Sequence, residues 1–172
     1  MTINKGQKLV KMVELMNRRG GIRAVELLDR FAIDPRTLRR YLSDLRGLDL
    51  PFVVHGRASD LAQPYSWVDV NNTRAFQRAT ELLLDLGHQR IALLNGLEHM
   101  DFAARRRAGY EAALATRGVD PDPSLMYSGE MTEAQGHDLT RTLLARPDRP
   151  TAILVSSMIM AIGVRRGIEE LG

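Results

Sequence analysis

Near the start of the sequence, one stretch carries side chains of the types that contact nucleic acid. These side chains are Arg36, Thr37, Arg39 and Arg40. Arginine makes bidentate hydrogen bonds to guanine and meets phosphates, and threonine contacts the methyl group of thymine. The preceding pair, Asp34 and Pro35, is typical of a helix start, because Asp caps helices and Pro is tolerated at the first position. The outer face of a helix that begins at Pro35 is therefore a candidate for binding duplex DNA.

Two further helices are expected to position this one. Apolar residues recur at helical spacing through the first part of the chain, and paired glycines and the Asp-Pro step separate the segments. The predicted helices span residues 7–19, 23–31 and 35–45. A long helix, a short helix and a capped third helix are typical of a helix-turn-helix domain. The alternative interpretation is a solvated basic helix on a small bundle.

The charge of the chain is divided unevenly. Residues 1–50 contain 3 Lys and 8 Arg against 6 acidic residues, whereas residues 51–172 contain 13 Arg against 15 acidic residues. The net charge of +3 therefore comes from an excess of positive charge in the first 50 residues. Such asymmetry favours a nucleic-acid-binding end joined to a different kind of domain.

The composition of the 172 residues excludes several classes of protein. The absence of cysteine excludes disulfides, zinc–cysteine sites and a cysteine nucleophile. No segment reaches the roughly 18 apolar residues of a membrane span, and residues 1–10 lack the apolar region of a secretory signal. We expect a cytoplasmic protein that does not enter a membrane.

Beyond residue 50, short apolar segments alternate with segments of helical periodicity. The predicted strands span residues 52–55, 67–70, 91–94, 125–127 and 152–155. The predicted helices span residues 72–86, 102–117, 132–145 and 158–171. Repeated β-α units with apolar, non-alternating strands predict an α/β fold, in which helices cover a parallel sheet. Ligands bind such sheets beyond the carboxyl ends of the strands.

No catalytic or metal-binding pattern is present in the sequence. The four histidines are scattered, and none has the spacing of a metal motif. Asp69 and Asp101 lie near predicted strand ends, but neither has an obvious acid–base partner. We expect no catalytic residues, no metal and no cofactor, and we do not expect an enzyme.

Residues 8–51, KLVKMVELMNRRGGIRAVELLDRFAIDPRTLRRYLSDLRGLDLP, resemble the winged helix-turn-helix of DeoR-type and WYL-domain regulators. The resemblance implies that the third helix reads DNA with Arg36, Thr37, Arg39 and Arg40. That family continues into a β-hairpin wing, whereas this chain continues directly into an apolar segment at residues 52–55.

Four further motifs follow in order along the second part of the chain. They are PFVVHGRA (51–58), WVDVNNTRAFQRATELLLDLGHQRIALLNG (67–96), RRAGYEAAL (106–114) and RPTAILVSSMIMAIGVRRGIEELG (149–172). In sequence, order and spacing they resemble the sugar-sensing domain of the LacI/GalR repressors. The resemblance implies a periplasmic-binding-protein-like α/β clamp that binds a small sugar between two subdomains.

The same resemblance implies an effector site. The arginine three positions before the glycine of the family's RxxGY motif is Arg106, whose planar fork suits several sugar hydroxyls. Phe102 and Met131 fall where family members line the pocket, and Ser156-Ser157 stands in place of a ligand-contacting Asn-Asp pair. We interpret the signature from Asp69 to Asn72 as a strand-to-helix turn in which Asn caps the helix.

The sequence therefore predicts an α/β protein: a partial periplasmic-binding-protein-like sheet with flanking helices, preceded by a small all-α helix-turn-helix domain. We place a winged helix-turn-helix at residues 1–50 and an incomplete sugar-binding domain at residues 51–172. The predicted function is a sugar-responsive transcriptional regulator, a repressor, that binds operator DNA as a homodimer. The alternative is a carbohydrate-binding or interaction module without DNA binding. An incomplete sheet would leave apolar strands uncovered and favour marginal stability, dimerisation and weak sugar binding.

Overall fold

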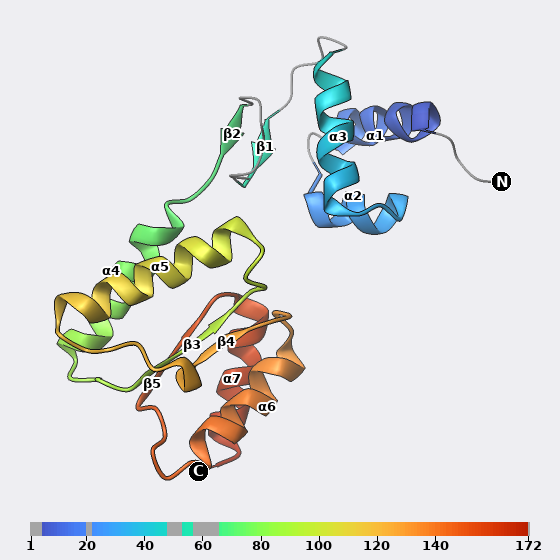
Figure 1. Ribbon diagram of the computed structural model, residues 1–172. Coiled ribbons are helices and arrows are strands. Elements are labelled where there is room, and N and C mark those ends of the chain that lie inside the picture. Colours follow the sequence, from blue (N-terminus) through green and yellow to red (C-terminus); the bar gives the residue numbers. More distant parts are fainter. Residues whose placement is uncertain (1–4, 20–21, 48–52, 57–65, 172) are drawn as a thin grey trace. The chain divides into compact units, whose positions relative to one another are not determined.

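The computed structural model describes residues 5–19, 22–47, 53–56 and 66–171. These residues divide into two compact units. The first contains three helices and a pair of short strands, and the second contains everything from Asp69 onward (Figure 1). Each unit has its own apolar core, so each is described by itself.

Three helices of the first unit lie where the sequence predicts them. They are α1 (Lys5–Arg19), α2 (Ala24–Phe31) and α3 (Pro35–Arg46). Met12, Leu27 and Leu38 contribute one buried side chain each from the three helices to a common core. The cap of α3 is confirmed, because Oδ1 and Oδ2 of Asp34 accept hydrogen bonds from the backbone N–H and hydroxyl of Thr37 at 2.9 and 2.6 Å. The hydrogen bond from the Thr37 side chain, followed by that from its backbone, lowers the pKa of Asp34.

The strands that follow α3 do not form a wing. Within the described residues, β1 (Val54–His55) pairs with β2 (Trp67–Val68), and the pair is parallel, with Val54 opposite Trp67. A wing is an antiparallel hairpin with a short turn, whereas a parallel pair needs a connection of roughly a dozen residues. The separation in sequence between the two strands suits the parallel arrangement. The described strands therefore do not form a wing, the winged helix-turn-helix placed at residues 1–50 stays a prediction, and Phe52 lies outside the described residues.

Apolar side chains in this strand pair and directly before it are exposed to solvent. Val53, Trp67 and Val68 have exposed fractions of 64 %, 46 % and 57 %. This agrees with the expectation that apolar strands would be left uncovered. The marginal stability and dimerisation inferred from it stay predictions.

The second unit is a layered α/β structure, as the sequence predicts. Its elements are α4 (Asn72–Asp85), β3 (Ile91–Asn95), α5 (Asp101–Thr116), the 3-10 turn η1 (Pro123–Leu125), β4 (Met126–Ser128), α6 (Glu133–Leu144), β5 (Ala152–Val155) and α7 (Met158–Glu169). The strand order is β4-β3-β5, and both pairings are parallel. Strand β4 begins one residue later than predicted, because Asp122 accepts a hydrogen bond from the Ser124 N–H at 2.9 Å and opens the 3-10 turn η1 instead.

Strand β3 is the buried centre of this unit (Figure 1). Its alternate side chains point to opposite faces of the sheet. Ile91 and Leu93 pack under α4 and α5, in a core that includes Tyr110. Ala92 and Leu94 pack on the other face, in a core formed with α6 and α7. The parallel sheet flanked by helices is therefore confirmed.

Glycines set the close approach of the helices on each face. A Cβ atom at Gly109 of α5 would overlap the backbone oxygen of Thr73 on α4. A Cβ atom at Gly163 of α7 would overlap the backbone oxygen of Glu133 on α6. Both helix pairs therefore depend on positions that have no side chain.

An ionic cluster also joins α6 to α7. His137 on α6 places its Nδ1 2.9 Å from Oδ1 of Asp138 and its Nε2 2.8 Å from Oε2 of Glu170 beyond α7. Hydrogen bonds that the ring donates to Asp138, the larger cause, and to Glu170 raise the pKa of His137. Arg166 on α7 completes the cluster with an ion pair to Glu133 at 2.5 Å.

We predict a pH-dependent contribution of His137 to stability. Because its pKa is higher in the folded chain than the unfolded value of 6.5, its contribution is complete below that value and is lost as pH rises through the folded pKa. The difference in Tm between the wild type and His137→Gln should therefore be larger at pH 5.5 than at pH 9. His88→Gln is the control, since the His88 ring contacts the hydroxyl of Thr151 and not a carboxylate. An equal difference at both pH values would contradict the prediction.

Candidate ligand-binding site

Polar side chains meet where β3 and β5 end. Asn95, the last residue of β3, is only 4 % exposed, and its Nδ2 donates to the backbone oxygen of Ala103 at 2.8 Å. Ser156 follows β5, and its hydroxyl donates to Oδ1 of Asn95 at 2.6 Å. Carboxyl ends of parallel strands are the usual ligand-binding edge of an α/β sheet. This polar cluster is therefore the candidate site.

Arg106 of α5 extends into this cluster and is fixed there. Its Nε donates to Oδ1 of Asn72 at 2.8 Å, and one terminal nitrogen donates to the backbone oxygen of Ser156 at 2.7 Å. The guanidinium carbon lies 5.2 Å from the ring centre of Phe76 and 4.8 Å from that of Phe102. Burial lowers the pKa of Arg106, and the negative charge of Asp69 acts in the opposite direction. The guanidinium is thus held by two acceptors and two aromatic rings.

Of the other predicted effector residues, Phe102 and Met131 lie beside Gly96, whereas Ser157 caps a helix. Phe102 and Met131 flank Gly96, since a Cβ at Gly96 would lie 2.9 Å from Cζ of Phe102 and 3.4 Å from Sδ of Met131. Ser157 instead caps α7, because its hydroxyl accepts from the N–H of Met160 at 3.2 Å. The structure therefore brings Arg106, Phe102 and Ser156 together and gives Ser157 a structural contact.

Three asparagines lie near the site, and the sequence alone predicts them only as turn or capping residues. Asn71 is the N-cap of α4, accepting from the Arg74 N–H at 3.0 Å, as that interpretation expects. Asn72 is 2 % exposed and points inward, donating to the carboxylate of Asp69 at 3.2 Å while accepting from Arg106. Asn95, which the following glycine marks as a turn residue, ends β3 instead. A polar residue that ends an apolar strand is the signal that identifies such a position.

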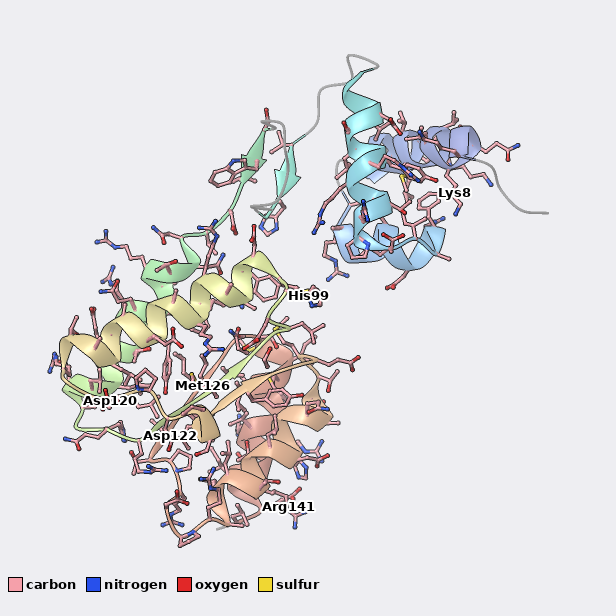
Figure 2. The ribbon with its side chains drawn as sticks, viewed as in Figure 1. Lys8, His99, Asp120, Asp122, Met126 and Arg141 are labelled. Atoms are coloured by element: carbon pink, nitrogen blue, oxygen red, sulfur yellow. The ribbon has the colours of Figure 1, made fainter. Side chains whose placement is uncertain are left out.

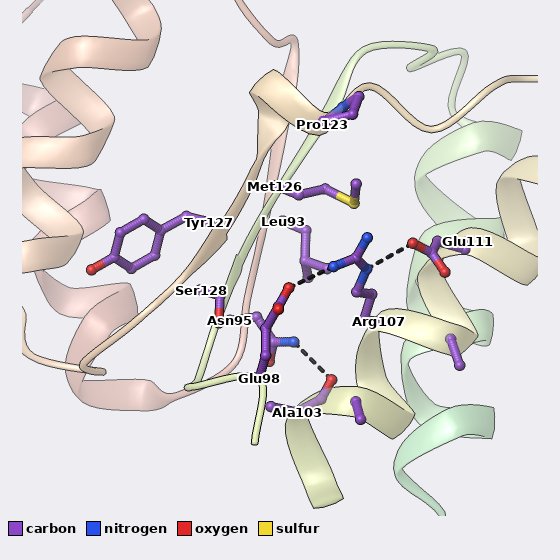
Figure 3. A pocket seen from close by; sticks show the side chains of 12 residues that line it. Leu93, Asn95, Glu98, Ala103, Arg107, Glu111, Pro123, Met126, Tyr127 and Ser128 are labelled. Carbon is purple, nitrogen blue, oxygen red and sulfur yellow. Dashed lines mark hydrogen bonds and ion pairs between the residues drawn. The ribbon is translucent and has the colours of Figure 1, made fainter. Parts of the chain in front are cut away.

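A hollow of about 460 Å³ lies beside this cluster, between α5 and β4 (Figure 3). Its floor includes Leu93 and Met126, and Asn95 belongs both to its lining and to the polar cluster. Arg107, next to Arg106 in sequence, faces the hollow and pairs with Oε1 of Glu98 at 2.5 Å and Oε1 of Glu111 at 2.8 Å (Figure 3). The side-chain hydrogen bond with Glu111 is the main cause that raises the pKa of Arg107. Arg106 and Arg107 are adjacent in α5, but Arg106 binds in the polar cluster and Arg107 pairs with glutamates at the hollow.

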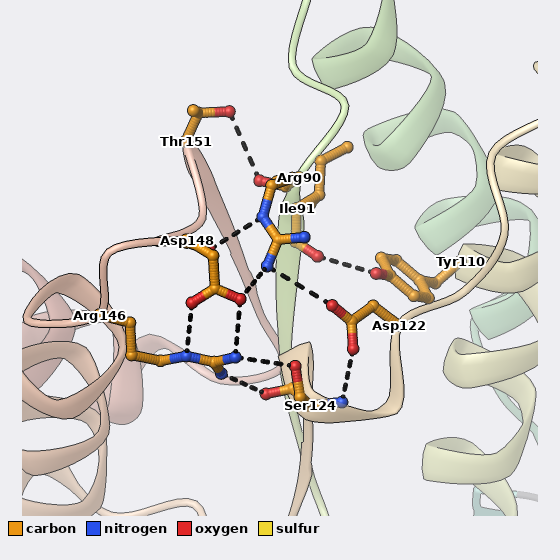
Figure 4. Close-up of polar contacts among 8 residues, drawn as sticks. All are labelled: Arg90, Ile91, Tyr110, Asp122, Ser124, Arg146, Asp148 and Thr151. Carbon is orange, nitrogen blue, oxygen red and sulfur yellow. Dashed lines mark hydrogen bonds and ion pairs between the residues drawn. The ribbon is translucent and has the colours of Figure 1, made fainter.

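The opposite end of the sheet carries a charged network (Figure 4). Arg90 donates to Oδ2 of Asp148 at 3.1 Å and lies 3.5 Å from Oδ2 of Asp122. Arg146 donates to the same oxygen of Asp148 at 3.1 Å, and its side-chain hydrogen bond is the main cause that lowers the pKa of Asp148. These mutually satisfied charges tie loops together at the amino ends of the strands.

The four predicted DNA-contacting residues lie along α3. Arg36 and Arg40 are exposed, while Thr37 and Arg39 are partly buried. The hydroxyl of Thr37 donates to Asp34, so this hydroxyl takes part in capping the helix. Among the described residues no group of three or more His, Asp or Glu side chains could hold a metal ion. The described helices also include none that is long and apolar enough to span a bilayer.

The three-layer α/β unit with a polar site at its strand ends has a periplasmic-binding-protein-like fold. The family described as periplasmic binding proteins and sugar binding domain of the LacI family matches residues 36–172, and the chain belongs to this family. The matched range begins inside α3 and therefore includes the positions of the four predicted DNA-contacting residues.

Named relatives are bacterial regulators. The chain is 43 % identical to the HTH-type transcriptional regulator AglR of Rhizobium meliloti (strain 1021) over 153 residues, which are 89 % of this chain and 42 % of AglR. It is 31 % identical to the HTH-type transcriptional regulator CelR of Thermobifida fusca over 124 residues, 72 % of this chain and 36 % of CelR. A LacI-family regulatory protein from Chloroflexus aggregans has a similar solved structure, with a TM-score of 0.74, 27 % identity, and coverage of 98 % of this chain and 59 % of that one. The chain thus spans less than half the length of these two curated relatives.

Proposed function

We propose that the α/β unit is the effector-sensing part of a LacI-family transcriptional regulator and binds a small sugar at the carboxyl ends of β3 and β5. The placement of Arg106 is the observation that carries this proposal. The side chain has five N–H donors. Among the described residues, Nε and one terminal nitrogen make its two hydrogen bonds, which leaves the second terminal nitrogen for ligand hydroxyls. A donor that is already fixed loses little freedom when a ligand binds.

The surroundings of Arg106 also suit a sugar. Phe102 and Met131 supply an apolar surface beside Gly96, and Asn95 and Ser156 supply polar atoms at the same strand ends. A sugar ring presents both hydroxyls and an apolar face, so it needs both kinds of surface. The description of the family and the names of its regulators support this assignment.

We propose in addition that the regulator is a cytoplasmic repressor that binds operator DNA as a homodimer, through Arg36, Thr37, Arg39 and Arg40 of α3. The capped start of α3 and the exposure of Arg36 and Arg40 support this part. The second candidate is a carbohydrate-binding module without DNA binding. It is favoured by the family match that begins inside α3 and by the parallel pairing of β1 with β2.

Calorimetry and DNA titration separate these functions. A panel of mono- and disaccharides should give a saturable heat with the full chain. Binding to duplex DNA, followed by fluorescence anisotropy, should weaken steeply between 50 and 200 mM salt. Arg36→Ala with Arg40→Ala should abolish sequence preference, whereas Arg165→Ala, on the exposed surface of α7, should leave it intact.

Each outcome decides one part. A sugar heat without a salt-dependent DNA complex would reject the DNA-binding part and leave the carbohydrate module. The absence of a saturable heat for every sugar would reject the sensor assignment. Sedimentation velocity on the full chain tests the dimer, and a monomer at all concentrations would contradict it.

A further inference from the structure

A basic cleft lies in the helical unit, between α1 and the end of α2. Its volume is about 410 Å³. It is lined by Lys8, Lys11, Glu14, Leu15, Arg18, Arg30, Phe31 and Ala32. The lining therefore combines four cationic side chains and one carboxylate with apolar surface. The proposed sugar site lies in the other unit, so this cleft is a separate feature.

Cationic side chains of this cleft outnumber its one carboxylate, Glu14. Within the described residues, Lys11, Arg18 and Arg30 take part in no ion pair. The described part of the α/β unit offers a contrast, since Arg107 pairs with two glutamates and Arg165 with Glu169 at 2.7 Å. Like charges that gather without partners repel one another, so an anion that entered the cleft would stabilise the helical unit.

One cation of the cleft is already positioned. The ammonium of Lys8 donates to the backbone oxygen of Phe31, at the end of α2, at 3.0 Å, and Figure 2 shows Lys8 among the side chains of this unit. An ammonium has three donors, so two remain for a ligand. The two arginines of the cleft add planar forks of the kind that pair bidentately with phosphate oxygens.

We propose that the cleft between α1 and α2 binds a phosphate group. A phosphate carries up to two negative charges and several acceptor oxygens, which matches a net excess of cations better than a single carboxylate does. The phosphate belongs either to a free sugar phosphate or to the backbone of nucleic acid. The inference goes beyond the proposed sugar sensing and base reading, and it does not depend on α3.

The test uses the full chain and a double variant, Lys11→Gln with Arg18→Gln. The control is Lys5→Gln, a change of the same kind on the same helix, because Lys5 lies outside the cleft and pairs with Asp44 at 2.9 Å. Circular dichroism first shows that each variant is folded. Inorganic phosphate and a hexose phosphate are then titrated by calorimetry, and a 20-base-pair duplex is titrated by anisotropy at several salt concentrations.

If the ligand is a free phosphate compound, the double variant should bind inorganic phosphate or hexose phosphate about tenfold or more weakly than the wild type. If the ligand is the nucleic-acid backbone, calorimetry should detect no binding of the small phosphates. The slope of log affinity for the duplex against log salt concentration should then fall by about 0.9 for each phosphate that the variant no longer neutralises, for all sequences alike. Glu14→Gln should strengthen binding in whichever arm is positive, because it removes the carboxylate of the cleft. Absence of binding in both arms, or equal effects of the double variant and Lys5→Gln, would overturn the inference. If the α3 variants lose sequence preference while both small-phosphate and duplex binding are unchanged in the cleft variants, the inference is overturned and the proposed reading of DNA by α3 stands.

Discussion

Alanine at position 163 is expected to lower the free energy of unfolding of the α/β unit by about 3 kcal/mol or more. A Cβ atom there would overlap the backbone oxygen of Glu133 and would lie 2.8 Å from the backbone nitrogen of His137, both on α6. Backbone atoms of a packed helix cannot move aside as a side chain does. Helices α6 and α7 must therefore separate, which disturbs the core around Met160 and Val164. Urea unfolding followed by circular dichroism measures the change.

Gly167→Ala on the same helix is the matched control. Its nearest neighbours would be the backbone oxygen of His137 and Cβ of Thr140, both at 3.0 Å, so only a small adjustment is needed. Alanine also favours helix over glycine by about 1 kcal/mol, which offsets part of the cost in both variants. Gly163→Ala should therefore be the more destabilising change. Equal stability of the two variants would show that the close approach at Gly163 does not limit the packing of α6 on α7.

Much of the fold could be predicted because local signals and global packing agree. Asp34 predicts the start of α3 and caps it with its side chain, and Thr132 does the same for α6 by accepting from the N–H of Gln135 at 3.2 Å. Gln135 lies three residues after Thr132, the spacing of a capping box, but its Oε1 accepts from the hydroxyl of Tyr127 at 2.7 Å. A tertiary partner thus replaces a local one, and sequence spacing carries no information about such a choice.

The pairing of strands is less predictable than their existence. Apolar segments at residues 52–55 and 67–70 suggest strands, and among the described residues the strands are Val54–His55 and Trp67–Val68. Periodicity identifies a strand but not its neighbour or its direction, so the choice between a wing and a parallel pair depends on the family resemblance. The parallel register of Val54 with Trp67 settles that choice for the described residues.

The candidate site requires contacts across long stretches of sequence. Arg106 is predicted from a resemblance, whereas its partner Asn72 is 34 residues away and Asn95 is 61 residues from Ser156. Neither composition nor hydrophobic periodicity predicts contacts between residues so far apart in the sequence. They follow from the parallel sheet, which brings the ends of β3 and β5 to one edge.

The second large effect is expected at Arg106 itself. Arg106→Met keeps the length of the side chain but removes both hydrogen bonds, so Oδ1 of the buried Asn72 is deprived of its donor. Leaving a buried acceptor without a partner costs about 1–3 kcal/mol, and we expect the free energy of unfolding to fall by about 2 kcal/mol. Saturable binding of any sugar that the wild type binds should disappear in calorimetry, because the positioned donor is gone.

Two further variants distinguish a ligand contact from a structural one. Arg106→Lys keeps the positive charge but lacks the fork that reaches Asn72 and Ser156 together, so sugar affinity should still fall at least about tenfold. A double-mutant cycle of Arg106→Met with Asn72→Ala should show a coupling energy of about 1 kcal/mol or more, since each residue stabilises the other. If stability falls as expected while sugar affinity is unchanged in both Arg106 variants, the arginine only joins α4, α5 and β5, and the sugar must bind elsewhere. Such a result would direct the search to the hollow beside Arg107, which shares Asn95 with this cluster.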